Sequence, residues 1–174
     1  MKKLIVIIAV LFFAINVFAQ HEQFIPIEQN DLQKFFSVHT EEEGPGTDYF
    51  DSLLLRLHVK KRIEPLFITK YDSKILESVL KKTQSRFSVL DFKYKYYFEF
   101  PSNAEWKEDK AVLSLFINDS LLKSYNNEIQ KNDEFWIFFI ITEYNTFTME
   151  GYGRVVDFLS KEAMIKKGLL VTPL

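Results

Sequence analysis

The residues of this chain that could do acid–base chemistry are its carboxylates. A glycosidase, for example, needs only two acids held several ångströms apart across a cleft. Because Asp and Glu are also common in turns and on surfaces, the sequence assigns no catalytic residue. A carboxylate-dependent hydrolase stays open as an alternative function, with Asp48 and Asp51, Glu105 with Glu108 and Asp109, and Glu143 with Glu150 and Asp157 as its candidate residues.

Several other catalytic chemistries are excluded by composition. The chain has no cysteine, so it has no thiolate nucleophile, thiolate zinc site, iron–sulfur cluster or redox pair. Its five glycines form neither of the common phosphate-binding motifs, G-x-x-x-x-G-K and G-x-G-x-x-G. The nucleophile motif G-x-S-x-G is also missing. We therefore expect no cofactor.

The histidines give little support to a metal site. None of the three, His21, His39 and His58, has a partner at the H-x-x-x-H spacing. His39 precedes Glu41–Glu43, and together they could offer a divalent cation one nitrogen and several oxygens. Three glutamates beside a Gly-Pro-Gly break are more typical of a solvated loop. In the predicted strand, His58 lies on the same face as Arg56 and Lys60, and we expect it to be exposed.

An aromatic ladder, DFKYKYYFEF at residues 91–100, is the strongest pattern in the chain. Strand alternation puts its lysines on the face opposite the aromatic residues, whereas a nucleic-acid groove needs both on one side. The chain also carries a net charge of -2, so we expect no nucleic-acid partner. The ladder is predicted to be a wall of the core, with Lys93, Lys95, Tyr97 and Glu99 facing water and Phe92, Tyr94, Tyr96, Phe98 and Phe100 facing inward.

The hydroxyl groups of the ladder keep a ligand hypothesis open. Burying a tyrosine hydroxyl without a partner costs on the order of 1–3 kcal/mol, so either buried acceptors exist or this wall lines a cavity. Three further aromatic residues lie in or near predicted loops. The candidate ligand-binding residues are therefore Tyr94, Tyr96, Trp106, Tyr144 and Tyr152.

The elements that position these residues are mostly strands. Period-two alternation or continuous apolar runs predict strands at 53–60, 66–70, 88–100, 111–117, 121–125, 134–142 and 154–159. The run at 134–142 is apolar at nearly every position and predicts a central strand covered on both faces. Asn118-Asp119-Ser120 predicts a tight turn, and Gly151-Tyr152-Gly153 a loop. Helical spacing predicts a helix over 72–83 with Asp72 at its N-cap, and a short helix from Ser160 closed by Gly168.

This order of elements indicates a mainly β, β-rich α+β protein. We expect an antiparallel sandwich or small barrel of about seven strands with one or two short helices. The alternative is a partly open barrel like the oligonucleotide/oligosaccharide-binding fold. No linker divides the chain, so residues 48–174 are predicted to be a single domain, with residues 20–47 as an N-terminal segment packed on it.

The first residues predict export. Lys2 and Lys3 precede the apolar run Leu4–Phe18, which ends at the small residue Ala19, the layout of a secretory signal peptide over residues 1–19. The run is shorter than the roughly 20 residues that span a bilayer, so we expect no stable membrane span after cleavage. The sequence thus predicts a secreted, periplasmic or cell-surface binding domain with an unknown protein or small-molecule partner. A structural or assembly role in the cell envelope is a further alternative.

Overall fold

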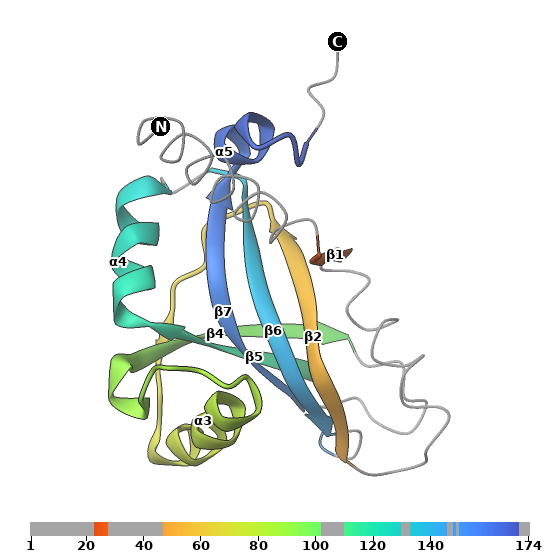
Figure 1. Ribbon diagram of the computed structural model, residues 1–174, viewed down its shortest axis with the longest axis vertical. Helices are drawn as coiled ribbons and strands as arrows, with labels where there is room; N and C mark the ends of the chain where they lie inside the picture. The colour runs from red at the N-terminus through yellow and green to blue at the C-terminus, as the bar shows by residue number, and fades with distance from the viewer. Residues whose placement is uncertain are drawn as a thin grey trace, which may run out of the picture.

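The computed structural model describes residues 23–27, 47–101, 110–129, 133–145, 148 and 150–170 of the chain. Within these residues it forms one seven-stranded sheet with helices on both faces (Figure 1). No helix in this part of the chain is long and apolar enough to cross a membrane. The elements are β1 (Ile25–Ile27), β2 (Thr47–Val59), β3 (Leu66–Phe67), α3 (Lys70–Lys82), the 3-10 turn η2 (Val89–Asp91), β4 (Phe92–Pro101), β5 (Lys110–Asn118), α4 (Asp119–Glu128), β6 (Phe135–Asn145), β7 (Glu150–Ser160) and α5 (Lys161–Lys166).

The sheet is mixed and open, with strand order β1-β2-β6-β7-β5-β4-β3. β1 runs parallel to β2 and β5 runs parallel to β7, and the other neighbours are antiparallel. β4 and β5 cross β2, β6 and β7 at a steep angle, because the sheet is strongly twisted (Figure 1). The prediction of a mainly β fold with about seven strands is confirmed. The seven strands make one sheet that is not closed, so the arrangement is neither two stacked sheets nor a full barrel.

Strand β6 is an interior strand of the sheet, as its composition predicts. It lies between β2 and β7, and Phe135–Phe139 are all buried. A strand covered on both faces needs apolar side chains at successive positions, which is why the segment shows no alternation.

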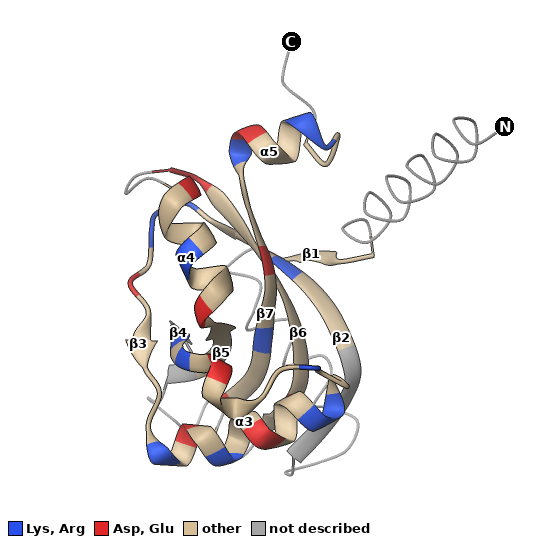
Figure 2. Ribbon diagram, turned by 60° about the vertical axis from the view of Figure 1, so that its left-hand side comes forward, with Lys and Arg blue, Asp and Glu red and all other residues tan. Residues whose placement is uncertain are grey.

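Within the described residues, three helices cover the two faces of the sheet. We call the face covered by α4 the inner face and the opposite one the outer face. On the inner face, Tyr125 of α4 packs among aromatic rings of three strands, with its ring centroid 6.0 Å from that of Tyr96, 5.2 Å from that of Phe135 and 4.6 Å from that of Phe158. On the outer face, α3 packs with Phe116 and Tyr152 at one end, and α5 packs with Trp136 and Phe138 at the other. Basic and acidic residues are interspersed along these helices (Figure 2).

Helix α4 occupies the segment predicted as a tight turn followed by a strand at 121–125, and that prediction is wrong. The Asn118 side chain accepts a hydrogen bond from the backbone N–H of Leu121 at 2.7 Å, the geometry of a helix N-cap. Leu122 and Tyr125, three residues apart, are then buried on one helical face.

Helix α3 begins two residues before its predicted start, and its N-cap is Thr69, so the assignment of Asp72 as N-cap is wrong. Asp72 instead completes a capping box from the third helical position, accepting a hydrogen bond from the Thr69 backbone N–H at 2.7 Å. Its other oxygen pairs with Lys95 Nζ at 2.7 Å. The short C-terminal helix is confirmed as α5, with the Ser160 side chain as its cap and Gly168 beyond it at φ +67°.

The aromatic ladder is divided between the two faces of the sheet. A register shift between Phe92 and Tyr94 puts one extra residue into β4. Phe92 therefore packs against α3 on the outer face, whereas Tyr96 and Phe98 belong to the inner core. The expectation that Lys95 faces water is wrong, because the Lys95 side chain, 14% exposed, is held against Asp72 of α3.

Candidate functional site

The structure places the five predicted ligand-binding residues in different surroundings. Tyr96 and Tyr144 are buried in the inner core, so they do not line a surface site. Tyr94 is half-buried, with its ring 4.7 Å from that of the exposed Phe67. Tyr152 lines a cavity, and Trp106 lies outside the described residues. The four of these residues that the structure describes therefore do not line one common surface.

The side-chain hydroxyl groups of Tyr96 and Tyr125 are buried in the core. Neither Tyr96 Oη nor Tyr125 Oη has a partner with hydrogen-bond geometry, although the two side chains are neighbours. Burial raises the pKa of Tyr96 well above its ordinary value, and the adjacent Tyr125 raises it further. Burial also raises the pKa of Tyr125, against the opposing charge of Arg62. Both side chains therefore stay neutral and contribute to the core by packing.

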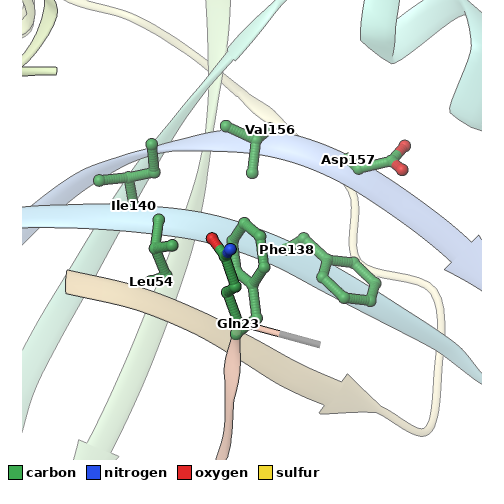
Figure 3. A pocket seen from close by; sticks show the side chains of 7 residues that line it. Gln23, Leu54, Phe138, Ile140, Val156 and Asp157 are labelled. Atoms are coloured by element: carbon green, nitrogen blue, oxygen red, sulfur yellow. The ribbon is translucent and has the colours of Figure 1, made fainter. Parts of the chain in front are cut away.

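A groove on the outer face of the sheet could hold a small molecule, although a cavity of about 560 Å³ beside α5 is larger. We call this groove the outer groove; its volume is about 330 Å³, at the low end for small-molecule sites. Figure 3 shows that β2, β6 and β7 each contribute side chains to it. Its lining is Gln23, Phe24, Leu54, Phe138, Ile140, Val156 and Asp157.

A β-bulge in β7 shapes one wall of the outer groove. Phe138 of β6 pairs with Asp157 and Phe139 pairs with Val155, so Val156 is an extra residue. Val155 and Phe158 face the inner core, whereas Val156 and Asp157, although consecutive, both line the groove (Figure 3). A regular strand would send one of them to the opposite face.

The floor of the outer groove is apolar and one part of its rim is polar. Phe138 is fully buried and meets Phe24 edge-on, with ring centroids 5.3 Å apart. Gln23 and Asp157 supply the polar atoms, and Asp157 Oδ1 accepts a hydrogen bond from the Phe158 backbone N–H at 2.8 Å. An apolar lining with a few fixed polar groups is the usual make-up of a small-molecule site.

A second cavity, of about 190 Å³, brings two of the predicted carboxylates together between α3 and the β6–β7 hairpin. We call it the polar cleft. Glu143 is bound to Lys82 Nζ at 2.6 Å, and Glu150 accepts the Tyr152 hydroxyl at 2.5 Å. Burial raises the pKa of Tyr152, and the hydrogen bond to Glu150 raises it further, so this hydroxyl stays a donor. The lining is Tyr71, Ile75, Glu143, Asn145, Thr148, Glu150 and Tyr152.

A second β-bulge, in β6, places the Glu143 side chain in the polar cleft. Ile141 pairs with Gly153 and Glu143 pairs with Tyr152, which leaves Thr142 as an extra residue in β6. Ile141 and Tyr144 both face the inner core. In a regular strand Glu143 would share the face of Ile141, and the bulge turns it outward instead.

The other candidates with chemical potential fall elsewhere. Glu105, Glu108, Asp109, His39 and Glu41–Glu43 lie outside the described residues, as do the side chains of Asp48 and Asp51. Among the described residues there is no group of three or more His, Asp or Glu that could hold a metal ion.

The expectation that His58 is exposed is wrong. Its side chain is 17% exposed and stacks on Trp136 of the neighbouring strand, with ring centroids 4.4 Å apart and an interplanar angle of 4°. Glu134 lies 3.9 Å from His58 Nε2. These contacts fix the imidazole against the sheet.

Sequence reasoning found two carboxylates and one tyrosine of the polar cleft but none of the apolar residues of the outer groove. The apolar run of β6 could have indicated the outer groove, because Phe138 and Ile140 place apolar side chains on the outer face of the sheet. Comparison with protein-family models, curated proteins and solved structures gave no match for the chain.

Proposed function

We propose that this protein is an exported, non-catalytic binding domain, and that the outer groove holds a small ligand with an apolar body. The observation that carries the proposal is the make-up of the groove, which combines an apolar floor of Leu54, Phe138 and Ile140 with polar groups at Gln23 and Asp157. Such a surface favours a ligand that buries apolar area against the floor and places its polar end beside Gln23 and Asp157.

A non-catalytic role is supported by the chemistry of the groove lining. Asp157 is its single carboxylate among the described residues, and its other polar residue is an amide. Acid–base hydrolysis of the glycosidase type needs two carboxyl groups across one cleft. The carboxylate-dependent hydrolase therefore remains a rival that would have to act in the polar cleft, at Glu143 and Glu150.

Export is part of the proposal and rests on residues 1–19, with their basic start and short apolar run. Expression of the full chain in a bacterium with a periplasm tests it. We expect intact-mass measurement of the periplasmic protein to give a chain that begins at Gln20. A chain retained in the membrane with its first residues intact would contradict this part.

Ligand binding is tested with an environment-sensitive apolar dye, an N-phenylnaphthylamine, which responds to an apolar site whatever the natural ligand is. We expect saturable fluorescence enhancement with one site per chain. Ile140→Trp should fill the groove and weaken binding at least tenfold, and Leu54→Lys should do the same by placing a charge in it. Both positions are half-buried, so the fold should tolerate these changes.

The matched control is Leu90→Trp, an equally large change at a side chain that is 88% exposed and outside the groove. Its dye affinity should equal that of the wild type. Equal loss of binding in the control, or unchanged binding in both groove variants, would reject the outer groove as the site. Native mass spectrometry of the purified protein provides a second readout, since dimers or larger species would favour the assembly role instead.

A further inference from the structure

We propose a second binding site, in the polar cleft, for an organic cation: an ammonium or guanidinium group carried by a small molecule. The site does not depend on the outer groove. Its chemistry is the opposite of the groove's, because hydrogen-bond acceptors and tyrosine side chains make up most of its lining.

The cleft is built by three separate segments. Tyr71 and Ile75 come from α3, Glu143 from the end of β6, and Glu150 and Tyr152 from the start of β7. The pairing of Glu143 with Tyr152 fixes the two strands relative to one another, and α3 packs on β7 beside them (Figure 1). The positions of the ligand-facing groups are therefore set by the sheet and by a packed helix.

Each carboxylate in the cleft is oriented by hydrogen bonds to only one of its two oxygens. Lys82 reaches Glu143 Oε2 at 2.6 Å. Tyr152 and Thr148 reach Glu150 Oε2, at 2.5 Å and 3.3 Å. Hydrogen bonds among the described residues leave Oε1 of both carboxylates as acceptors. An ionised carboxylate accepts and cannot donate, so the guest must bring N–H or O–H groups.

The charge balance favours a cation over a neutral donor. Among the described residues at the cleft, Glu143 and Glu150 contribute two negative charges and the paired Lys82 one positive charge, which leaves a net charge of minus one. Arg154, on the same face of β7, donates to Thr83 Oγ1 at 2.9 Å and does not line the cavity. A buried or half-buried carboxylate with no cation of its own attracts a positively charged guest.

The aromatic side of the cleft points to an organic cation. Tyr71 is 67% exposed at the cleft, whereas most aromatic rings in the described part of the chain are buried. A cation over the face of a tyrosine ring within about 6 Å is attracted by the ring quadrupole. A bare metal ion would need several oxygen or nitrogen ligands, and no group of three suitable residues exists in the described part of the chain.

The test is a titration of the purified, isotope-labelled protein, followed by amide chemical shifts, with n-butylguanidinium and n-butylammonium as probes. We expect saturable shifts at the backbone amides of Thr148, Gly151 and Tyr152. The neutral isostere n-butylurea should bind at least tenfold more weakly. Glu150→Gln should weaken the binding of both cations at least tenfold.

The matched control is Glu77→Gln, which removes the same charge from an exposed position on α3 outside the cleft. Its cation affinity should stay within twofold of the wild type. Tyr71→Ala, at an exposed site that should not disturb folding, provides a second variant and should also weaken binding.

Four results would overturn the proposal: equal weakening by Glu77→Gln, equal binding of n-butylurea, binding of calcium alone, or no saturable shift with either cation. The groove variant Ile140→Trp should keep its cation binding, so the failure of one site can be told from the failure of the other.

Discussion

Replacing Gly153 by alanine tests the sheet geometry most directly. Gly153 lies within β7 and faces Ile141 of β6, rather than in the loop that Gly151-Tyr152-Gly153 predicts from sequence. A Cβ atom on Gly153 would stand 2.3 Å from the backbone oxygen of Ile140 and 3.0 Å from the Cα of Ile141. Carbon–oxygen contacts between strands are normally about 3.3–3.6 Å. The two central strands would have to separate by about 1 Å.

The expected cost follows from what must move. Overpacking a core costs about 1–3 kcal/mol and sometimes more, and here the obstacle is the backbone of the central strand. We expect Gly153→Ala to lower the free energy of unfolding by about 3 kcal/mol or more. Gly151→Ala is the matched control, because its Cβ would meet only side-chain atoms, Tyr144 Cδ2 at 3.2 Å and Leu113 Cδ1 at 3.3 Å. Those side chains yield by small rotations, so its cost should stay near or below about 1 kcal/mol.

Urea unfolding followed by tryptophan fluorescence measures both changes. With an m-value of about 2 kcal/mol per molar, a loss of about 3 kcal/mol moves the midpoint down by about 1.5 M. The Gly151→Ala midpoint should move by about 0.5 M or less. If Gly153→Ala proved no less stable than Gly151→Ala, the close approach of β6 and β7 at this point would be wrong.

Three further predictions concern Asp72, Tyr96 and Asn118. Burial alone would raise the pKa of Asp72, but hydrogen bonds from Lys95 and Thr69 outweigh it and hold that pKa below its ordinary 3.8. Asp72 therefore stabilises the fold above about pH 4 and loses this contribution as the pH falls through its folded pKa. In thermal unfolding, the loss of stability caused by Asp72→Asn should be largest at neutral pH and smaller in acid. Tyr96→Phe removes a buried hydroxyl that has no hydrogen-bond partner among the described residues. In urea denaturation the free energy of unfolding of this variant should lie between that of the wild type and a value about 1.5 kcal/mol higher. A decrease of more than about 1 kcal/mol would show that the hydroxyl makes a hydrogen bond. Asn118→Ala removes the cap of α4 and should cost about 1 kcal/mol in the same assay, while a neutral result would argue against the helix start.

Local patterns were enough to predict the elements whose signals lie within a few residues of one another. The helical spacing at 72–83 predicted α3 to within two residues, and Gly168 predicted the end of the last helix. The continuous apolar run predicted β6 as a covered central strand. The helix and strand predictions depend on which face a side chain presents, and this follows from the period of the element. The helix end depends on the positive φ that glycine adopts easily.

Tertiary structure decided the features that depend on distant residues. Asn118 is equally suited to a turn and to the N-cap of a helix. The helix forms because it buries Leu122 and Tyr125 against strands that are distant in the sequence. The extra residues in β6 and β7 are set by pairing between the two strands, so the alternation of either strand alone could not reveal them.

Those two bulges also created both candidate sites. The sequence contained Glu143, Glu150, Asp157 and Tyr152 as separate residues with chemical potential. An extra residue in β6 turned Glu143 toward Glu150 and Tyr152, and an extra residue in β7 turned Asp157 to the face of Val156, where both line a different cavity. Because one inserted residue reverses the face of everything after it in a strand, the grouping of these side chains was fixed only when the register between β6 and β7 was set.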